Sequence, residues 1–138
     1  MHSIYFVLLA GLLICSWEDV RSHMVSLPFV IIWTVLLCGM QIYQGNLDVV
    51  LLLAPVFTVG FATILSRLAG GGIGTGDGFL FAMAVMGLGV AKGIQMFFYC
   101  FAGAFCVAVI LLVLFSGKKE TRIPLAPFIL GGSLLAIL

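Results

Sequence analysis

Residues 93–116 read GIQMFFYCFAGAFCVAVILLVLFS, a run of 24 residues that contains no Asp, Glu, Lys or Arg. An α-helix rises about 1.5 Å per residue, so this run is long enough to cross the roughly 30 Å hydrocarbon core of a bilayer. Outward from it, glycines, prolines and short polar stretches separate five further apolar runs. The sequence therefore predicts an all-α polytopic membrane protein, a bundle of about six transmembrane helices, with candidate spans at residues 3–18, 25–43, 48–66, 77–91, 93–116 and 123–138.

The composition supports this fold class. Of 138 residues, 64% are hydrophobic and 8% are charged, and the mean hydropathy is +1.35, whereas soluble domains average about 25% charged residues. Six spans of about 20 residues would use almost the whole chain. We therefore expect one transmembrane domain over residues 1–138, with the lipid bilayer as its surroundings. A net charge of +1 leaves no basic face for nucleic acid, so we expect no nucleic-acid partner.

The basic residues predict the orientation in the membrane. Five of the six Lys and Arg residues lie in the first, third and fifth connections: Arg21, Arg67, Lys118, Lys119 and Arg122. Lys92 is the exception, in the fourth connection. Because positively charged loops stay in the cytoplasm, we expect the odd-numbered connections on that side of the cell membrane and both termini outside.

Two aspartates stand out among the five acidic residues of the chain. Asp19 and Asp77 are 58 residues apart (77 − 19 = 58), and each lies where an apolar span meets an odd-numbered connection. The charge distribution therefore places both on the cytoplasmic side. Ionisable groups at membrane depth are costly and are usually functional. The alternative is structural: Asp19 pairs with Arg21 or Arg67, and Asp77 caps the fourth helix.

The stretch around Asp77 favours a functional role. Residues 70–78 read GGGIGTGDG, and glycines leave room for another backbone to approach closely. An extended peptide can therefore reach a carboxylate in this stretch. The pattern is not a phosphate loop, because no GK[ST] follows, and no start position gives GxGxxG. A packing role for Gly74, Gly78 and Ala82, spaced by four, is compatible with catalysis by the neighbouring aspartate.

Other kinds of site find little support in the sequence. The four cysteines, Cys15, Cys38, Cys100 and Cys106, all lie in apolar runs without a CxxC pair, so we interpret them as packing residues. There is no HExxH motif and no histidine cluster, so neither a metal nor another cofactor is expected.

Three stretches together resemble type IV prepilin peptidases. Residues 74–77, GTGD, form a GxGD motif, and GFLFAMAVMG at 78–87 resembles its continuation in that family. DVRSHMV at 19–25 resembles the DxRxxxI stretch after the family's first helix. RIPLAPF at 122–128 resembles the IPFGPF-type start of the last helix. The three motifs occur in the family's order and span nearly the whole chain.

The resemblance implies an intramembrane aspartyl endopeptidase that removes the basic leader of prepilin or pseudopilin precursors at the cytoplasmic face. Asp19 and Asp77 would be the catalytic pair, acting without a metal or other cofactor. We expect Glu18, Arg21, Gly74, Gly76 and Gly78 to contact the substrate. The chain resembles the short peptidases of Flp/Tad-type pilus systems or of archaeal preflagellin-like systems. The Cys-rich domain of larger members has no counterpart in it, so N-methylation of the product is not implied.

Two rival interpretations remain open from the sequence. A small transporter or channel subunit would also carry a few acids at the membrane border. A GxGD protease of the presenilin kind would act on other substrates, although residues 125–127, LAP, do not form its PAL motif. Within the peptidase interpretation, helix dipoles favour an anion at Asp77, near a helix start, over Asp19, near a helix end. That predicts Asp77 as the base and Asp19 as the acid.

Overall fold

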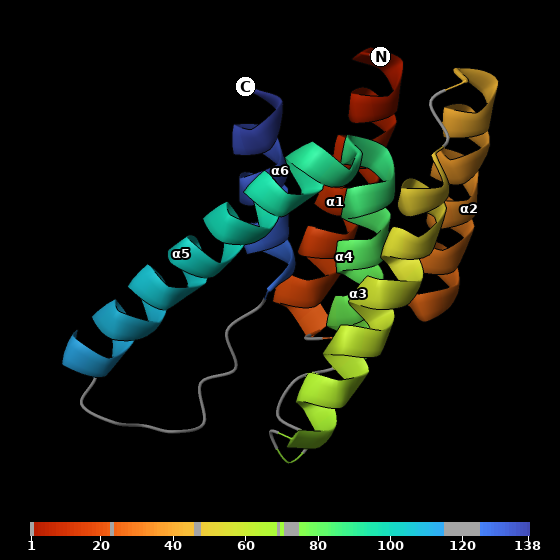
Figure 1. The fold of residues 1–138 in the computed structure, drawn as a ribbon. Helices are drawn as coiled ribbons and strands as arrows, with labels where there is room; N and C mark the ends of the chain where they lie inside the picture. Colours follow the sequence, from red (N-terminus) through yellow and green to blue (C-terminus); the bar gives the residue numbers. More distant parts are fainter. Residues whose placement is uncertain (1, 23, 46–47, 69, 71–74, 115–124) are drawn as a thin grey trace.

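Six helices make up the part of the chain that the computed structural model describes, which is residues 2–22, 24–45, 48–68, 70, 75–114 and 125–138 (Figure 1). They are α1 (His2–Ser22), α2 (Leu27–Tyr43), α3 (Val49–Leu68), α4 (Thr75–Leu88), α5 (Val90–Leu114) and α6 (Ala126–Ile137). These ranges contain no strand. The predicted all-α bundle is confirmed.

Three of these helices, α1, α3 and α5, are long and apolar enough to cross a membrane. Their outer surfaces carry large apolar side chains that a soluble protein would bury, for example Phe57 at 73% exposed and Val113 at 76% exposed. Exposure of this kind over whole helices indicates that lipid surrounds them. The helices α2, α4 and α6 are shorter, with 17, 14 and 12 residues, and they complete the bundle.

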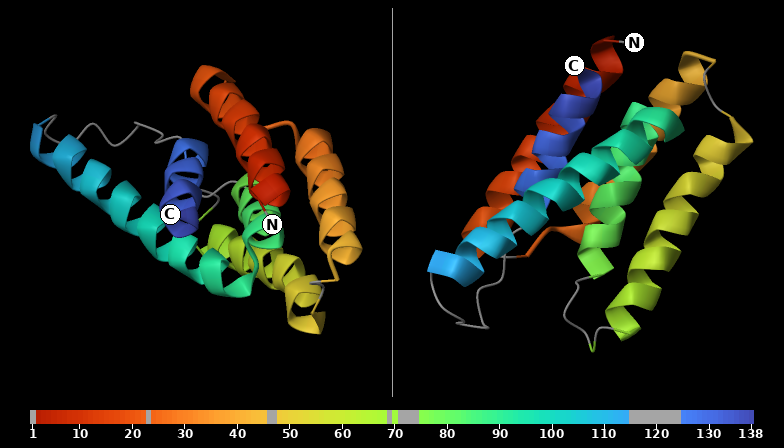
Figure 2. Two further views of the ribbon diagram at one scale, coloured as in Figure 1. Left: turned by 90° about the horizontal axis from the view of Figure 1, so that it is seen from above. Right: turned by 60° about the vertical axis from the view of Figure 1, so that its left-hand side comes forward.

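Consecutive helices run in opposite directions, so the connections alternate between the two ends of the bundle (Figures 1 and 2). Both termini lie at one end, with the α2–α3 and α4–α5 connections. Arg21 and Arg67 lie in the last turns of α1 and α3, which are at the opposite end. The other three basic residues of the odd-numbered connections, Lys118, Lys119 and Arg122, lie outside the described residues.

Helix α4 is the centre of the fold. It contacts each of the other five helices, and every residue from 80 to 88 is buried. Because protein surrounds it on all sides, α4 does not need the length of a lipid-facing span. Its side chains are apolar around the whole circumference, as is typical of a fully enclosed helix.

Several helix bounds differ from the sequence prediction, and two of these differences have a clear physical cause. The break between the fourth and fifth helices lies at Gly89 rather than near Lys92, because Gly89 has a φ of +84°, a left-handed conformation that glycine adopts at no steric cost. Helix α1 continues to Ser22 rather than ending at residue 18, since no glycine or proline interrupts the chain there. Asp19 therefore lies inside the last turn of a helix rather than in a loop.

A buried amide holds the C-terminal end of α4. The last carbonyls of a helix lack partners within the helix, and in an apolar surrounding an unpaired carbonyl is costly. The side-chain nitrogen of Gln41, on α2, donates a hydrogen bond to the Met86 carbonyl at 3.0 Å. Gln41 is only 5% exposed, so this polar side chain is buried where the end of α4 needs a donor.

Replacement of this amide provides a test of its role. We expect Gln41→Leu to lower the stability of the protein by about 1–3 kcal/mol, because the buried Met86 carbonyl loses its partner. The measurement is thermal unfolding in detergent. Gln95→Leu is the matched control, since Gln95 is exposed on α5 and its replacement should leave the melting temperature nearly unchanged. Equal melting temperatures for wild type and Gln41→Leu would contradict the assignment.

Candidate active site

Asp19 is held between two helices that are distant in the sequence. It lies in the last turn of α1, is only 8% exposed, and one of its carboxylate oxygens, Oδ2, accepts a hydrogen bond from the backbone N–H of Ala126 at 3.1 Å. Ala126 is the first residue of α6, where backbone N–H groups have no partner within the helix. The carboxylate of Asp19 thus caps α6 from across the bundle.

Asp77 lies in the first turn of α4 and is half-buried. Its carboxyl group is close enough to that of Asp19 for the two to interact electrostatically. The structure therefore brings together the two aspartates that the sequence singled out, one from the end of α1 and one from the start of α4. Amide hydrolysis by a pair of carboxyl groups needs an acid and a base at one place, so this pair is a candidate catalytic site.

Two cysteines border the aspartate pair. Cys100, on α5, is an electrostatic neighbour of Asp77, and Cys15, one helical turn before Asp19 on α1, is a neighbour of Asp19. Both thiols are fully buried. Cys15 and Cys100 are therefore packing residues that also form part of the wall of the candidate site. Cys15 was detectable from its spacing of four residues before Asp19, whereas nothing in the sequence connects Cys100 with Asp77.

The glycines beside Asp77 differ in their surroundings. A Cβ atom at Gly78 would lie 2.6 Å from the Cβ of Ala62 on α3, so α3 and α4 touch at this point. A Cβ atom at Gly76 would have nothing within 4 Å, which leaves open space beside the aspartate. Gly78 is therefore a packing residue, whereas Gly76 is the residue that a peptide can approach. Gly74 lies outside the described residues.

The remaining expected substrate contacts lie toward the first connection. The side chain of Glu18 is half-exposed, and its Oε2 accepts a long hydrogen bond from the Ser26 backbone N–H at 3.4 Å, so Glu18 links the end of α1 to the start of α2. Arg21 is exposed in the last turn of α1. Adjacent residues on a helix point about 100° apart, so Glu18 and Asp19 are directed to different neighbours.

A metal centre finds no support in the described part of the chain, where no group of three or more His, Cys, Asp and Glu side chains is placed to hold an ion. The arrangement can instead exchange protons between two carboxyl groups and a third molecule. The fold and the site define a membrane-embedded helical bundle with a carboxyl pair near one end. No family model, curated protein or solved structure matches this chain.

The two glycines provide a matched pair of variants. We expect Gly78→Ala to lower the melting temperature, because overpacking of a close contact typically costs about 1–3 kcal/mol. Gly76→Ala should leave it unchanged or raise it, since alanine is favoured over glycine in a helix by about 1 kcal/mol. Thermal unfolding in detergent measures both.

A compensating change distinguishes crowding from other effects of the added methyl group. The double variant Gly78→Ala/Ala62→Gly restores the space between α3 and α4. Its loss of stability should therefore be smaller than the sum of the losses in the two single variants. Strict additivity, or an equal loss at Gly76 and Gly78, would show that the contact between α3 and α4 is not the cause.

Proposed function

We propose that this protein is an intramembrane aspartyl endopeptidase that removes the basic leader from prepilin or pseudopilin precursors of the Flp/Tad type. The observation that supports the proposal is that Asp19, in the last turn of α1, and Asp77, in the first turn of α4, lie at the same end of two helices that are in contact. The two residues are separated by 58 positions (77 − 19 = 58) and come from different helices. They are also the residues that match the two aspartate motifs of the prepilin peptidase family. The site needs no cofactor for this reaction.

The proposed location is the cytoplasmic side of the cell membrane. Asp19 and Arg21 share the last turn of α1, and Arg67 is in the last turn of α3, at the same end of the bundle as Asp77 at the start of α4 (Figure 1). Basic residues that flank membrane spans favour the cytoplasmic side. A basic leader that remains in the cytoplasm would then lie at the same end of the bundle as Asp19 and Asp77.

The hydrogen bond from Ala126 reverses the roles expected from the sequence. Dipoles of α1 and α4 alone favoured Asp77 as the anion, but Asp19 also lies at the N-terminal end of α6 and accepts its N–H. A backbone donor and the positive end of a helix dipole both stabilise a carboxylate more than a carboxylic acid. We therefore assign Asp19 as the general base and Asp77 as the general acid.

The reaction then proceeds in two proton-balanced steps. Asp19 takes a proton from water as the water oxygen bonds to the scissile carbonyl carbon, and Asp77 gives its proton to the carbonyl oxygen. In the tetrahedral intermediate, the C–N bond breaks as Asp19 returns its proton to the leaving nitrogen. Asp77 regains a proton from one hydroxyl of the intermediate. The products are a carboxylic acid and an amine, and both aspartates return to their starting states.

Co-expression with a panel of Flp-type and other prepilins tests the function. We expect the wild type to remove the leader, as seen by product mass, and both Asp19→Ala and Asp77→Ala to leave only the precursor. Asp48→Ala is the control, because Asp48 is exposed next to the start of α3 at the other end of the bundle. Processing by either aspartate variant would show that the catalytic assignment is wrong, and an intact precursor with wild type across the panel would overturn the function.

The rate of cleavage tests the role of the α6 N-terminus. Ala126→Pro removes the backbone N–H that donates a hydrogen bond to Asp19 and holds its carboxylate in place. A hydrogen bond to a charged group contributes about 1.5–3 kcal/mol, so its loss should lower the rate by about ten-fold or more. Leu125 has α-region dihedrals, which a following proline disfavours, so thermal unfolding of the variant in detergent is measured in parallel. Ala126→Gly, which keeps the N–H, is the control, and an unchanged rate in Ala126→Pro would contradict the role given to this hydrogen bond.

A further inference from the structure

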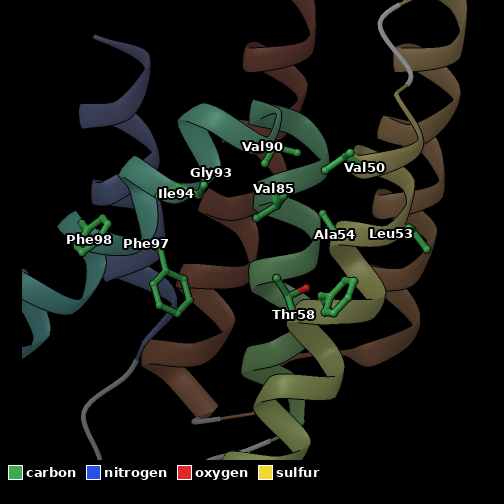
Figure 3. A pocket seen from close by; sticks show the side chains of 11 residues that line it. Val50, Leu53, Ala54, Thr58, Val85, Val90, Gly93, Ile94, Phe97 and Phe98 are labelled. Atoms are coloured by element: carbon green, nitrogen blue, oxygen red, sulfur yellow. The ribbon is translucent and has the colours of Figure 1, made fainter.

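An apolar groove of about 680 Å³ lies between α3 and α5, with α4 as its floor (Figure 3). Val85 of α4 lies at the back, Ala54 and Thr58 of α3 form one wall, and Phe97 and Phe98 of α5 form the other. The hydroxyl of Thr58 donates to the Pro55 carbonyl at 2.9 Å, so it is satisfied within its own helix. The groove therefore offers apolar contacts to whatever occupies it.

The arrangement of three helices creates this groove. Helices α3 and α5 each pack on α4 but have little contact with each other. Helix α5 diverges from the rest of the bundle toward its C-terminal end (Figures 1 and 2). Because the surroundings are hydrocarbon, the opening between α3 and α5 is accessible sideways from the lipid rather than from water.

Both walls of the groove lead toward Asp77. On α3, the carbonyl oxygen of Thr58 would lie 3.6 Å from a Cβ at Gly78, the residue that follows Asp77. On α5, Phe97 lies about one helical turn before Cys100, the electrostatic neighbour of Asp77. A chain that lies along the groove therefore reaches the aspartate at the end of α4.

We propose that this groove is the docking site for the transmembrane helix of the precursor, which enters from the lipid with its basic leader toward Asp19 and Asp77. The inference rests on the proposed function and adds the place where the substrate binds.

The position of the groove selects this occupant over a lipid tail or a second copy of the chain. The lining of the groove is uncharged, and its walls reach the surroundings of Asp77 at the start of α4. The proposed substrate has an apolar helix that can lie in the groove and a scissile bond next to that helix, which would then lie at the carboxyl pair. A lipid tail or a second copy of this chain would fill the groove without presenting such a bond.

Photo-crosslinking from exposed phenylalanines tests the inference. A photoreactive phenylalanine analogue replaces Phe57 or Phe98, one on each wall and 73% and 71% exposed, or Phe6 on α1, which is 79% exposed and outside the groove. Asp77→Asn in the same chains keeps the precursor intact. We expect the full-length precursor to be captured from positions 57 and 98, with only background capture from position 6.

Cleavage by the chain with its aspartates intact is measured in parallel, which separates the two proposals. If that chain removes the leader but positions 57 and 98 capture no precursor, the groove is not the docking site, although the function stands. Capture of lipid alone, a crosslinked dimer of this chain, or equal capture from position 6 would each overturn the inference as well. If no precursor in the panel is cleaved, the proposed function fails, and the docking inference fails with it.

Discussion

The enclosure of α4 by the other five helices is the constraint on which the rest of the structure depends. Lipid tails are as apolar as leucine, so burial of apolar area does not drive helices together in a membrane, and close packing and polar contacts must do so. The structure uses both at the ends of α4. At its start, Gly78 lets α3 approach within contact distance, and at its end Gln41 satisfies the Met86 carbonyl. With both ends fixed, the position of Asp77 in the first turn is fixed as well.

The two aspartates differ because different helix ends surround them. Asp19 lies in the last turn of α1, where the helix dipole disfavours an anion. It also lies where α6 begins, and its carboxylate accepts a hydrogen bond from the N–H of Ala126. Asp77 belongs to the start of α4, beside Gly76, which leaves open space next to it. Environments that push two carboxyl groups toward different protonation states are how acid and base roles are separated in a pair of identical residues. In the proposed reaction, the asymmetry of the pair therefore arises from tertiary contacts rather than from either helix alone.

The sequence predicted the features that follow from hydropathy and charge. Apolar runs indicated six helices and their approximate bounds, and the alternation of connections placed Asp19 and Asp77 at the same end. Contacts made by the backbone could not be predicted from the sequence. The N–H of Ala126 and the carbonyl of Met86 are groups that almost every residue has, so the residue type does not show which of them are used. The helix break was placed near Lys92 because a charge interrupts the apolar run there, whereas the backbone turns at Gly89, where a left-handed conformation is required. The sequence also contained no sign that α5 diverges, since that depends on which partners pack against it.

The position of the aspartates at one end of the bundle agrees with the proposed function, because moving charge into hydrocarbon is costly. A leader rich in Lys and Arg cannot enter the hydrocarbon, where each such residue costs about 2.5–3.5 kcal/mol at the centre of a helix. A bond between a basic leader and an apolar helix therefore lies at the membrane border, and a protease for that bond needs its acid and base at the same depth. Asp19 ends α1, and Asp77 begins α4, which meets this requirement. In the proposed docking, the groove that opens sideways to the lipid would let the apolar helix of a substrate stay in hydrocarbon while only its end reaches the carboxyl pair.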